Sequence, residues 1–201
     1  MRDALGGRSL ASPDLDVVVE GDGPGVARAL ADALVAPLVE HARFLTATVG
    51  PTSAGLVDVA TARSERYDRR GALPRVMPSS IEQDLRRRDF TVNAMAVELA
   101  SGSFGLLDRH GGRVDLAARR LKILHPASFV EDPTRIFRAA RYAARLGLRV
   151  DPWTARCEAW ALSLVPYPAL SGARIVAELE HILREARPEA ALVALGRAGA
   201  Y

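Results

Sequence analysis

The sequence predicts a mixed α/β (α+β) part over residues 1–125, followed by an all-helical part over residues 126–201. Three observations predict this fold class. β-Branched runs between Gly- and Pro-rich turns gather in the first third of the chain. After Pro126 nearly every segment repeats its apolar residues at helical spacing. A length of 201 residues with 49% hydrophobic side chains allows one domain, or two small ones, with a real core.

The elements of the first part follow from short runs and their punctuation. Asp14–Glu20 (DLDVVVE) is a predicted strand between a Ser-Pro turn and a Gly-rich turn. The other predicted elements are a helix near 24–37, strands at 44–49 and 56–61, a mobile loop at 67–80, a helix at 81–88, the apolar stretch FTVNAMAVEL, and a short helix at 116–120. In the second part helices are predicted at 133–147, 153–164, 172–186 and 188–199.

Composition excludes several classes of protein. No uncharged apolar run approaches the ~20 residues that a bilayer requires, so no membrane association is expected. The N-terminus lacks the profile of a secretory signal. The single cysteine, Cys157, forms neither an internal disulfide nor a cysteine metal cage, which fits a reducing cytoplasm. Its expected role is that of a small buried hydrophobe.

The basic side chains are almost all arginine and are unevenly distributed. Of 27 Lys and Arg residues only Lys122 is lysine. Residues 63–88 carry 8 basic and 4 acidic side chains, and residues 109–149 carry 10 and 3, whereas residues 1–62 carry 4 and 8. Arginine suits phosphate, although a GC-rich genome also favours it. Acidic side chains that could bind a cation, next to arginines that could bind phosphate, indicate nucleotide or nucleic-acid chemistry.

Three carboxylates are candidates for catalysis. Asp14 and Asp16 are two residues apart on a predicted strand, so their side chains face the same way. Asp58 lies between Val57 and Val59 and faces away from them. If the two strands are neighbours the three groups converge, as two-metal phosphoryl transfer requires, and Mg²⁺ is the expected ion. Turn and cap aspartates are the structural alternative.

Two arginine-rich motifs are candidates for nucleotide binding. Arg86–Arg88 run directly into Asp89 and an apolar stretch, so at least one guanidinium is expected near the core boundary, where a charge is kept only if paired. Of these, Arg88 is expected to pair with Asp89 or with a bound triphosphate.

The second motif begins a helix. Asp132 before Pro133 is a strong helix start, and Gly147 is a strong stop.

The helix after Asp132 carries an arginine stripe. Its members fall within about a third of the circumference and have no interleaved glutamate, which favours a polyanion over a solvated face; they are Arg135, Arg138, Arg141 and Arg145. Asp132 and Arg135 are neighbours at the helix mouth and together could read a base edge, a plain cap with a local salt bridge being the alternative.

At these residues the chain resembles the class II tRNA nucleotidyltransferase/poly(A) polymerase family. The resemblance rests on five ordered blocks that run nearly end to end: RDALGGR…PDLDVVVEGD, RFLTATV, DVATARSERY, DLRRRDFTVNAMA, and LLDRHGGRVDL before SFVEDPTRIFRAARYAARLG. It implies a polymerase-β-like head with a mixed sheet over 1–125, then a helical neck over 126–201.

The resemblance also implies roles for individual residues. Asp14 and Asp16 would ligate Mg²⁺ and Arg2 would contact the incoming nucleotide. Arg88 or Arg87 would bind its phosphates or ribose. Asp132 and Arg135 would select CTP or ATP, with Arg138 and Arg141 also on the nucleotide. The implied reaction is attack of an RNA 3′-hydroxyl on the α-phosphate of CTP or ATP, as in addition or repair of the tRNA CCA end.

The resemblance is incomplete at both ends. The family has a glycine pair before V-R-D, whereas this sequence begins Met1-Arg2-Asp3, and the family's later RNA-binding helices lie beyond Tyr201. The sequence is therefore expected to be a fragment, a chain that works with a separate RNA-binding chain or domain, or a non-catalytic nucleotide- or RNA-binding remnant. HARFLTATV stands where poly(A) polymerases carry an arginine-rich segment, which favours CCA-type or partial (CC- or A-adding) activity over poly(A) synthesis.

Overall fold

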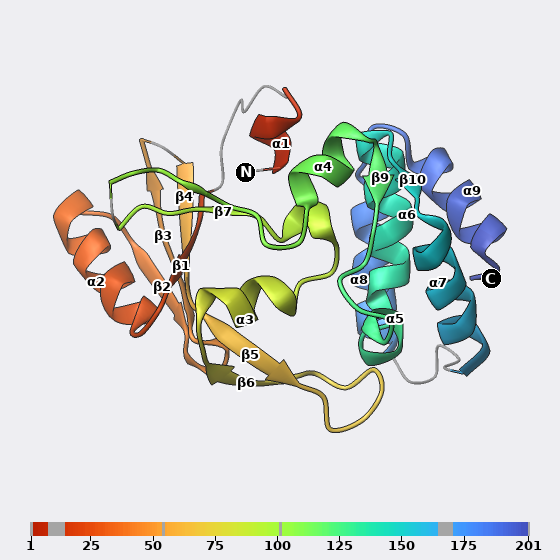
Figure 1. Ribbon diagram of the computed structural model, residues 1–201. Helices are drawn as coiled ribbons and strands as arrows, with labels where there is room; N and C mark the ends of the chain where they lie inside the picture. Colours follow the sequence, from red (N-terminus) through yellow and green to blue (C-terminus); the bar gives the residue numbers. More distant parts are fainter. Residues whose placement is uncertain (1, 8–14, 54, 101, 165–170, 201) are drawn as a thin grey trace. The chain divides into compact units, whose positions relative to one another are not determined.

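The computed structural model describes residues 2–7, 15–53, 55–100, 102–164 and 171–200. The chain forms two compact units (Figure 1). Unit 1 comprises residues 1–6, 67–74 and 88–201, and unit 2 comprises residues 7–66 and 75–87. The two units are treated separately below.

Unit 2 is built on a four-stranded mixed sheet in the order β1-β4-β3-β2. Strand β1 (Leu15–Val19) runs parallel to β4 (Gly55–Thr61). Strands β3 (Thr46–Thr52) and β2 (Leu38–His41) continue the sheet in antiparallel fashion. Helix α2 (Gly23–Leu34) covers one face (Figure 1), and the core between them contains Ala27, Ala31, Ala47, Val49, Val57 and Val59. The remaining elements are η1 (Ala42–Phe44), β5 (Arg63–Arg66), β6 (Arg75–Pro78) and α3 (Ile81–Arg86).

The start of α2 is fixed against the sheet by its first residues. The Asp22 side chain accepts the amide of Gly25, and Pro24 occupies the first turn. Gly23 donates its amide to the Thr61 hydroxyl, and a Cβ at Gly23 would lie only 2.5 Å from the Thr61 backbone nitrogen. Glycine is therefore required where the helix meets the end of β4.

Unit 1 is mostly helical, with short strands. Its helices are α1 (Arg2–Leu5), η2 (Thr91–Asn93), α4 (Gly112–Ala117), α5 (Ser128–Glu131), α6 (Thr134–Leu146), α7 (Pro152–Leu164), α8 (Gly172–Leu183) and α9 (Pro188–Ala198). The strands pair as β7 (Ala96–Val97) with β8 (Leu106–Leu107) and β9 (Arg120–Leu121) with β10 (Arg149–Val150). Helix α6 packs against α8 and α9 around a core that includes Phe90, Phe129, Ile136, Ile182 and Leu195.

Several predicted elements are confirmed and others are wrong. The predicted strands and long helices are present with shifts of a few residues at their ends, and Cys157 is buried. Strand β2 was not predicted. Residues 75–78 pair with β5 in a hairpin instead of forming loop, and the short helix expected at 116–120 lies at Gly112–Ala117. The domain boundary near residue 125 stays a prediction, and the core of unit 1 contains residues from both sides of it.

None of the helices that the structure describes has the length and apolar character needed to cross a membrane.

Candidate active site

Two of the three predicted carboxylates lie side by side on the sheet of unit 2. Asp16 in β1 is the direct register partner of Asp58 in β4. Partners in a parallel pair face the same side of a sheet, and adjacent strands lie about 4.8 Å apart. Val57 and Val59 are buried toward α2, so Asp58 and Asp16 face the opposite, open side. The condition set from sequence, that the two strands be neighbours, is therefore met; Asp14 lies outside the described residues.

The open face offers these carboxylates a hydroxyl but no counter-charge. Thr48 in β3 is the register partner of Asp58 and donates its hydroxyl to Asp58 Oδ1 at 2.5 Å. Among the described residues neither Asp16 nor Asp58 forms an ion pair. Two exposed like charges held this close repel each other, and a divalent cation with hard oxygen ligands relieves that repulsion. The donor set therefore fits a divalent metal ion.

Arg87 belongs to an ion cluster at the base of the β5–β6 hairpin. Its guanidinium donates to Asp84 Oδ1 at 2.7 and 3.1 Å, to Glu65 Oε1 at 2.7 Å, and to the Arg63 carbonyl at 3.2 Å. The Asp84 side chain is fully buried. Burial, and then the neighbouring Arg87, lower the pKa of Arg63. The expectation that one arginine of the triplet is paired at the core boundary is confirmed, and the donors of Arg87 are already used.

Arg2 and Arg88 converge on Asn93 in unit 1. Arg2 donates to the Asn93 side-chain oxygen at 2.5 Å, and Arg88 donates to its carbonyl oxygen at 3.3 Å. Arg2 also donates to Asp3, and its guanidinium lies 4.8 Å from the centre of the Tyr142 ring. Although burial opposes it, the bond to Asp3 raises the pKa of Arg2. Two predicted nucleotide contacts are thus gathered at one point.

Asp89 is the buried anchor of this cluster. Both Nε and a terminal nitrogen of Arg138 donate to its Oδ2, at 2.9 and 2.6 Å. Its Oδ1 accepts from the Asn93 amide and the Phe90 backbone, both at 2.8 Å. Burial would raise the pKa of Asp89, but Arg138 and these donors outweigh it and hold the pKa below its usual value. The buried Asp89 carboxylate thus pairs with Arg138. From the sequence, Arg88 was the expected partner of Asp89.

Asp132, just before the N-terminus of α6, accepts hydrogen bonds from Thr134 and from Arg174. Its Oδ1 accepts from the Thr134 amide at 3.1 Å, from the Thr134 hydroxyl at 2.7 Å and from Arg174 of α8 at 2.7 Å. Arg174 also donates to the Gly71 carbonyl at 2.8 Å. Among the described residues no donor reaches Oδ2, so one carboxylate oxygen remains able to accept an amine from a ligand.

The arginine stripe of α6 is not an open cationic ladder, and that part of the prediction is wrong. Arg135 is only 5% exposed; it donates to Ser128 at 2.7 Å and to the Tyr67 hydroxyl at 3.5 Å. Arg141 is 9% exposed and pairs with Glu185 at 3.3 Å, which Arg145 also approaches at 3.8 Å. The interleaved acids missing from α6 itself come from other segments, because α8 packs on this face.

Sequence reasoning missed three residues of these clusters. Asn93 lies inside the motif DFTVNA, and a polar amide directly after the apolar run was the available signal. Thr48 follows from strand alternation once β3 is placed beside β4. Arg174 had no local signal, since it lies 42 residues after its partner Asp132.

The four-stranded mixed sheet of unit 2, together with the likeness of the chain to solved CCA-adding enzymes, places the head in the polymerase-β-like nucleotidyltransferase class. Within that class the chain belongs to the family described as the poly A polymerase head domain, whose model matches residues 1–122.

Named relatives extend the match beyond the head. The chain is 41% identical over 200 residues to an A-adding tRNA nucleotidyltransferase of Geobacter sulfurreducens, covering 99% of this chain and 22% of that protein. It is 43% identical over 190 residues to a CC-adding tRNA nucleotidyltransferase of Deinococcus radiodurans, covering 94% and 49%. The chain therefore spans less than half the length of either relative.

Solved structures match over nearly the whole chain. A CCA-adding enzyme in its apo form II superposes with a TM-score of 0.89 at 38% identity, covering 98% of this chain and 46% of that one. A tRNA nucleotidyltransferase complexed with a primer tRNA and an incoming ATP analogue gives 0.85 at 33% identity, covering 99% and 55%.

Proposed function

We propose that this chain is the nucleotide-adding part of an RNA 3′-end nucleotidyltransferase, which transfers CMP or AMP from CTP or ATP to the 3′ end of tRNA during CCA addition or repair. The observation that carries the proposal is the exposed register pair of Asp16 and Asp58 without a counter-charge. The relatives are named for A-adding and CC-adding activity, and one solved relative holds a primer tRNA and an ATP analogue, which supports the substrates. We place the reaction in the cytoplasm.

The carboxylates of unit 2 would organise the reacting groups. Asp16 and Asp58, with Asp14 two residues before Asp16, would hold Mg²⁺, and the Thr48 hydroxyl fixes the orientation of Asp58. When bound there, the ion would lower the pKa of the attacking 3′-hydroxyl and neutralise charge that develops at the α-phosphate. The carboxylates would hold the reacting groups for in-line attack of the hydroxyl on the α-phosphate, with pyrophosphate as the leaving group.

The arginines of unit 1 would bind the nucleotide. Arg2, Arg88 and Arg138 are oriented by Asn93 and Asp89, so little side-chain entropy remains to be lost when phosphate binds. Arg87 and Arg141 already pair with acidic side chains, and we assign them the support of these cationic groups.

The mouth of α6 would select the base. Asp132 Oδ2 would accept the exocyclic amine that cytosine and adenine share and that uracil lacks, and Arg135 would donate to the ring edge. Arg174 and Thr134 hold the other carboxylate oxygen, which orients Oδ2. This arrangement explains how one site could accept CTP and ATP and reject UTP.

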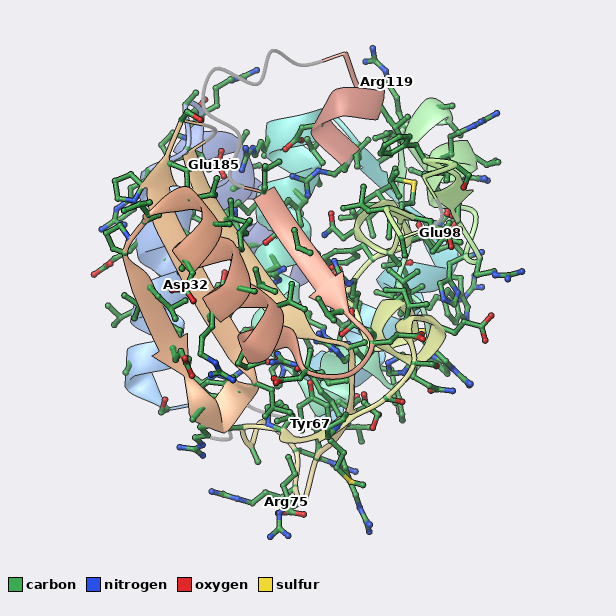
Figure 2. The ribbon with its side chains drawn as sticks, turned by 90° about the vertical axis from the view of Figure 1, so that its left-hand side faces the viewer. Asp32, Tyr67, Arg75, Glu98, Arg119 and Glu185 are labelled. Carbon is green, nitrogen blue, oxygen red and sulfur yellow. The ribbon has the colours of Figure 1, made fainter. Side chains whose placement is uncertain are left out.

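The test is incorporation of labelled CTP and ATP into a tRNA that lacks its CCA end. We expect Asp16→Ala to lower incorporation by about a thousandfold or more, because removal of a metal-holding carboxylate withdraws most of the electrostatic stabilisation. Asp32→Ala is the matched control, since Asp32 is an exposed aspartate of the same unit on α2, the helix that covers the opposite face of the sheet (Figure 2). Equal activity of the two variants would refute the metal assignment.

Base selection is tested separately. Asp132→Ala is expected to reduce discrimination against UTP by about tenfold or more, since one good base contact contributes about 1–3 kcal/mol. An unchanged preference among the four nucleotides would remove Asp132 from the base-selecting role. Products that extend far beyond three nucleotides on any RNA 3′ end would instead identify a poly(A) polymerase.

A further inference from the structure

The outward face of the small β9–β10 sheet in unit 1 collects cations. Arg120 of β9 is the register partner of Arg149 of β10, so both side chains face the same side. The residues after Arg120 alternate, with Leu121 and Ile123 buried and Lys122 exposed. Lys122 therefore lies on the same outward face.

Most of these cations have no partner in the structure. Among the described residues, Arg119, Lys122 and Arg149 form no side-chain hydrogen bond or ion pair, and all three are exposed. Only Arg120 is paired, to the buried Asp115 at 3.0 Å. Arg119 lies in the turn before β9, and its side chain points away from the ribbon (Figure 2). Arg138 and Arg141 of α6 differ, because they pair with the acidic side chains of Asp89 and Glu185 in the same unit.

A shallow, open hollow adjoins this cationic face. It has a volume of about 340 Å³ and is lined by Lys122, Asp151 and Trp153. Asp151 accepts the backbone amides of Trp153 and Thr154 through Oδ1 and thereby caps α7. With Asp151 Oδ1 engaged in the cap, the hollow presents the half-buried Trp153 and the exposed Lys122.

We propose that this cationic face, made of Arg119, Arg120, Lys122, Arg149 and Trp153, binds the sugar-phosphate backbone of the acceptor RNA and receives one unpaired base against Trp153. Cations spread along a sheet match a charged strand, and a base stacks on an aromatic side chain regardless of its identity. The proposal rests on the proposed function, in which RNA is the acceptor.

The experiment measures the affinity of the full chain for a fluorescent tRNA lacking its CCA end, by anisotropy, over salt concentrations from about 50 to about 200 mM. In the variant Arg119→Gln/Lys122→Gln/Arg149→Gln we expect at least about tenfold weaker binding. The slope of log affinity against log salt should fall by about 2 to 3, because each phosphate contact contributes about 0.7–0.9. ATP and CTP affinities should stay unchanged.

A matched triple variant controls for net charge. Arg184→Gln/Arg187→Gln/Arg197→Gln removes the same charge from exposed positions at the end of α8 and around α9, two of them paired locally with Glu180 and Glu189. It should bind tRNA nearly as the unchanged chain does. The proposal would be overturned if both triple variants lost the same tRNA affinity, or if the salt slope of the first variant were unchanged. It would also be overturned if polyglutamate displaced the fluorescent tRNA as effectively as unlabelled tRNA does.

Stacking on Trp153 has its own readout. Trp153→Leu is expected to weaken binding of a short single-stranded RNA by about fivefold or more, and Trp153→Phe to restore most of it. Equal affinity of the unchanged chain and Trp153→Leu would remove the base site. Nucleotide incorporation separates this proposal from the proposed function. If the chain binds RNA through this face but does not incorporate CTP or ATP, the RNA-binding surface is supported and the nucleotidyltransferase activity is refuted.

Discussion

Removal of the Asp89 carboxylate should be among the most destabilising single changes in unit 1. The group is 6% exposed and accepts two bonds from Arg138, one from Asn93 and one from the Phe90 backbone. Breaking a buried ion pair by deleting one partner costs about 3–5 kcal/mol. Because a third of the Arg138 side chain stays in contact with water, we expect the lower end of that range for Asp89→Ala.

The assay is urea unfolding at neutral pH, which gives the free energy of unfolding and its denaturant slope. The double variant Asp89→Ala/Arg138→Met should lose less stability than the two single variants added together, with a coupling energy of about 1–3 kcal/mol. Arg184→Ala is the control, because its pair with Glu180 is exposed and contributes less than about 0.5 kcal/mol. A loss below about 1 kcal/mol for Asp89→Ala, or strict additivity in the cycle, would show that the pair does not anchor the cluster.

Two further changes test the packing of unit 1. Burial raises the pKa of Glu158 to about 7, so the folded chain binds a proton that the unfolded chain releases near its ordinary pKa; stability should fall as pH rises from near 4.5 to near 7. Glu158→Gln should remove that fall and raise the free energy of unfolding by about 2–3 kcal/mol near pH 8. Urea unfolding of both chains near pH 4.5 and near pH 8 measures this, and an unaltered dependence of stability on pH would contradict it. Gly112→Ala would press a Cβ onto the Thr91 carbonyl and 2.9 Å from Met95 Cγ, so we expect a loss of about 1–3 kcal/mol by thermal unfolding, whereas Gly172→Ala, with nothing within 4 Å, should be nearly neutral.

The sheet of unit 2 was largely predictable, because its information is local. The strand around Asp16 and the strand around Asp58 are β-branched runs bounded by turns, and alternation alone places both carboxylates opposite the buried valines. Which strands pair is a non-local fact. Strand β2 escaped prediction because LVEH is short, half polar and lies at the edge of the sheet, where three of its four residues are exposed.

The arginine stripe on α6 shows where local reasoning fails. Periodicity placed Arg135, Arg138 and Arg141 on one face correctly, but the partners of these groups come from outside the helix. Arg135 bonds to Ser128 and to the remote Tyr67, whereas Asp89 and Glu185, both more than 40 residues away, pair with Arg138 and Arg141. A helix sequence carries no record of which remote acid will pack on it. The inference from an unrelieved stripe to an open polyanion site was therefore unsafe.

Whether a cationic side chain is paired or exposed in the fold indicates its function better than its spacing along the sequence does. A guanidinium that is partly buried and held by a carboxylate has already lost part of its water and much of its rotamer freedom, so it can orient a neighbour or meet a single ligand group at small further cost. An exposed, unpartnered cation keeps its hydration and its counterions, and it gains by releasing those counterions to a polyanion. Arg138 is of the first kind and Lys122 of the second. If both proposals hold, the same arginine-rich composition would serve two separate tasks in unit 1, nucleotide contact at the N-terminus of α6 and RNA contact on β9–β10, and the two tasks should respond differently to salt.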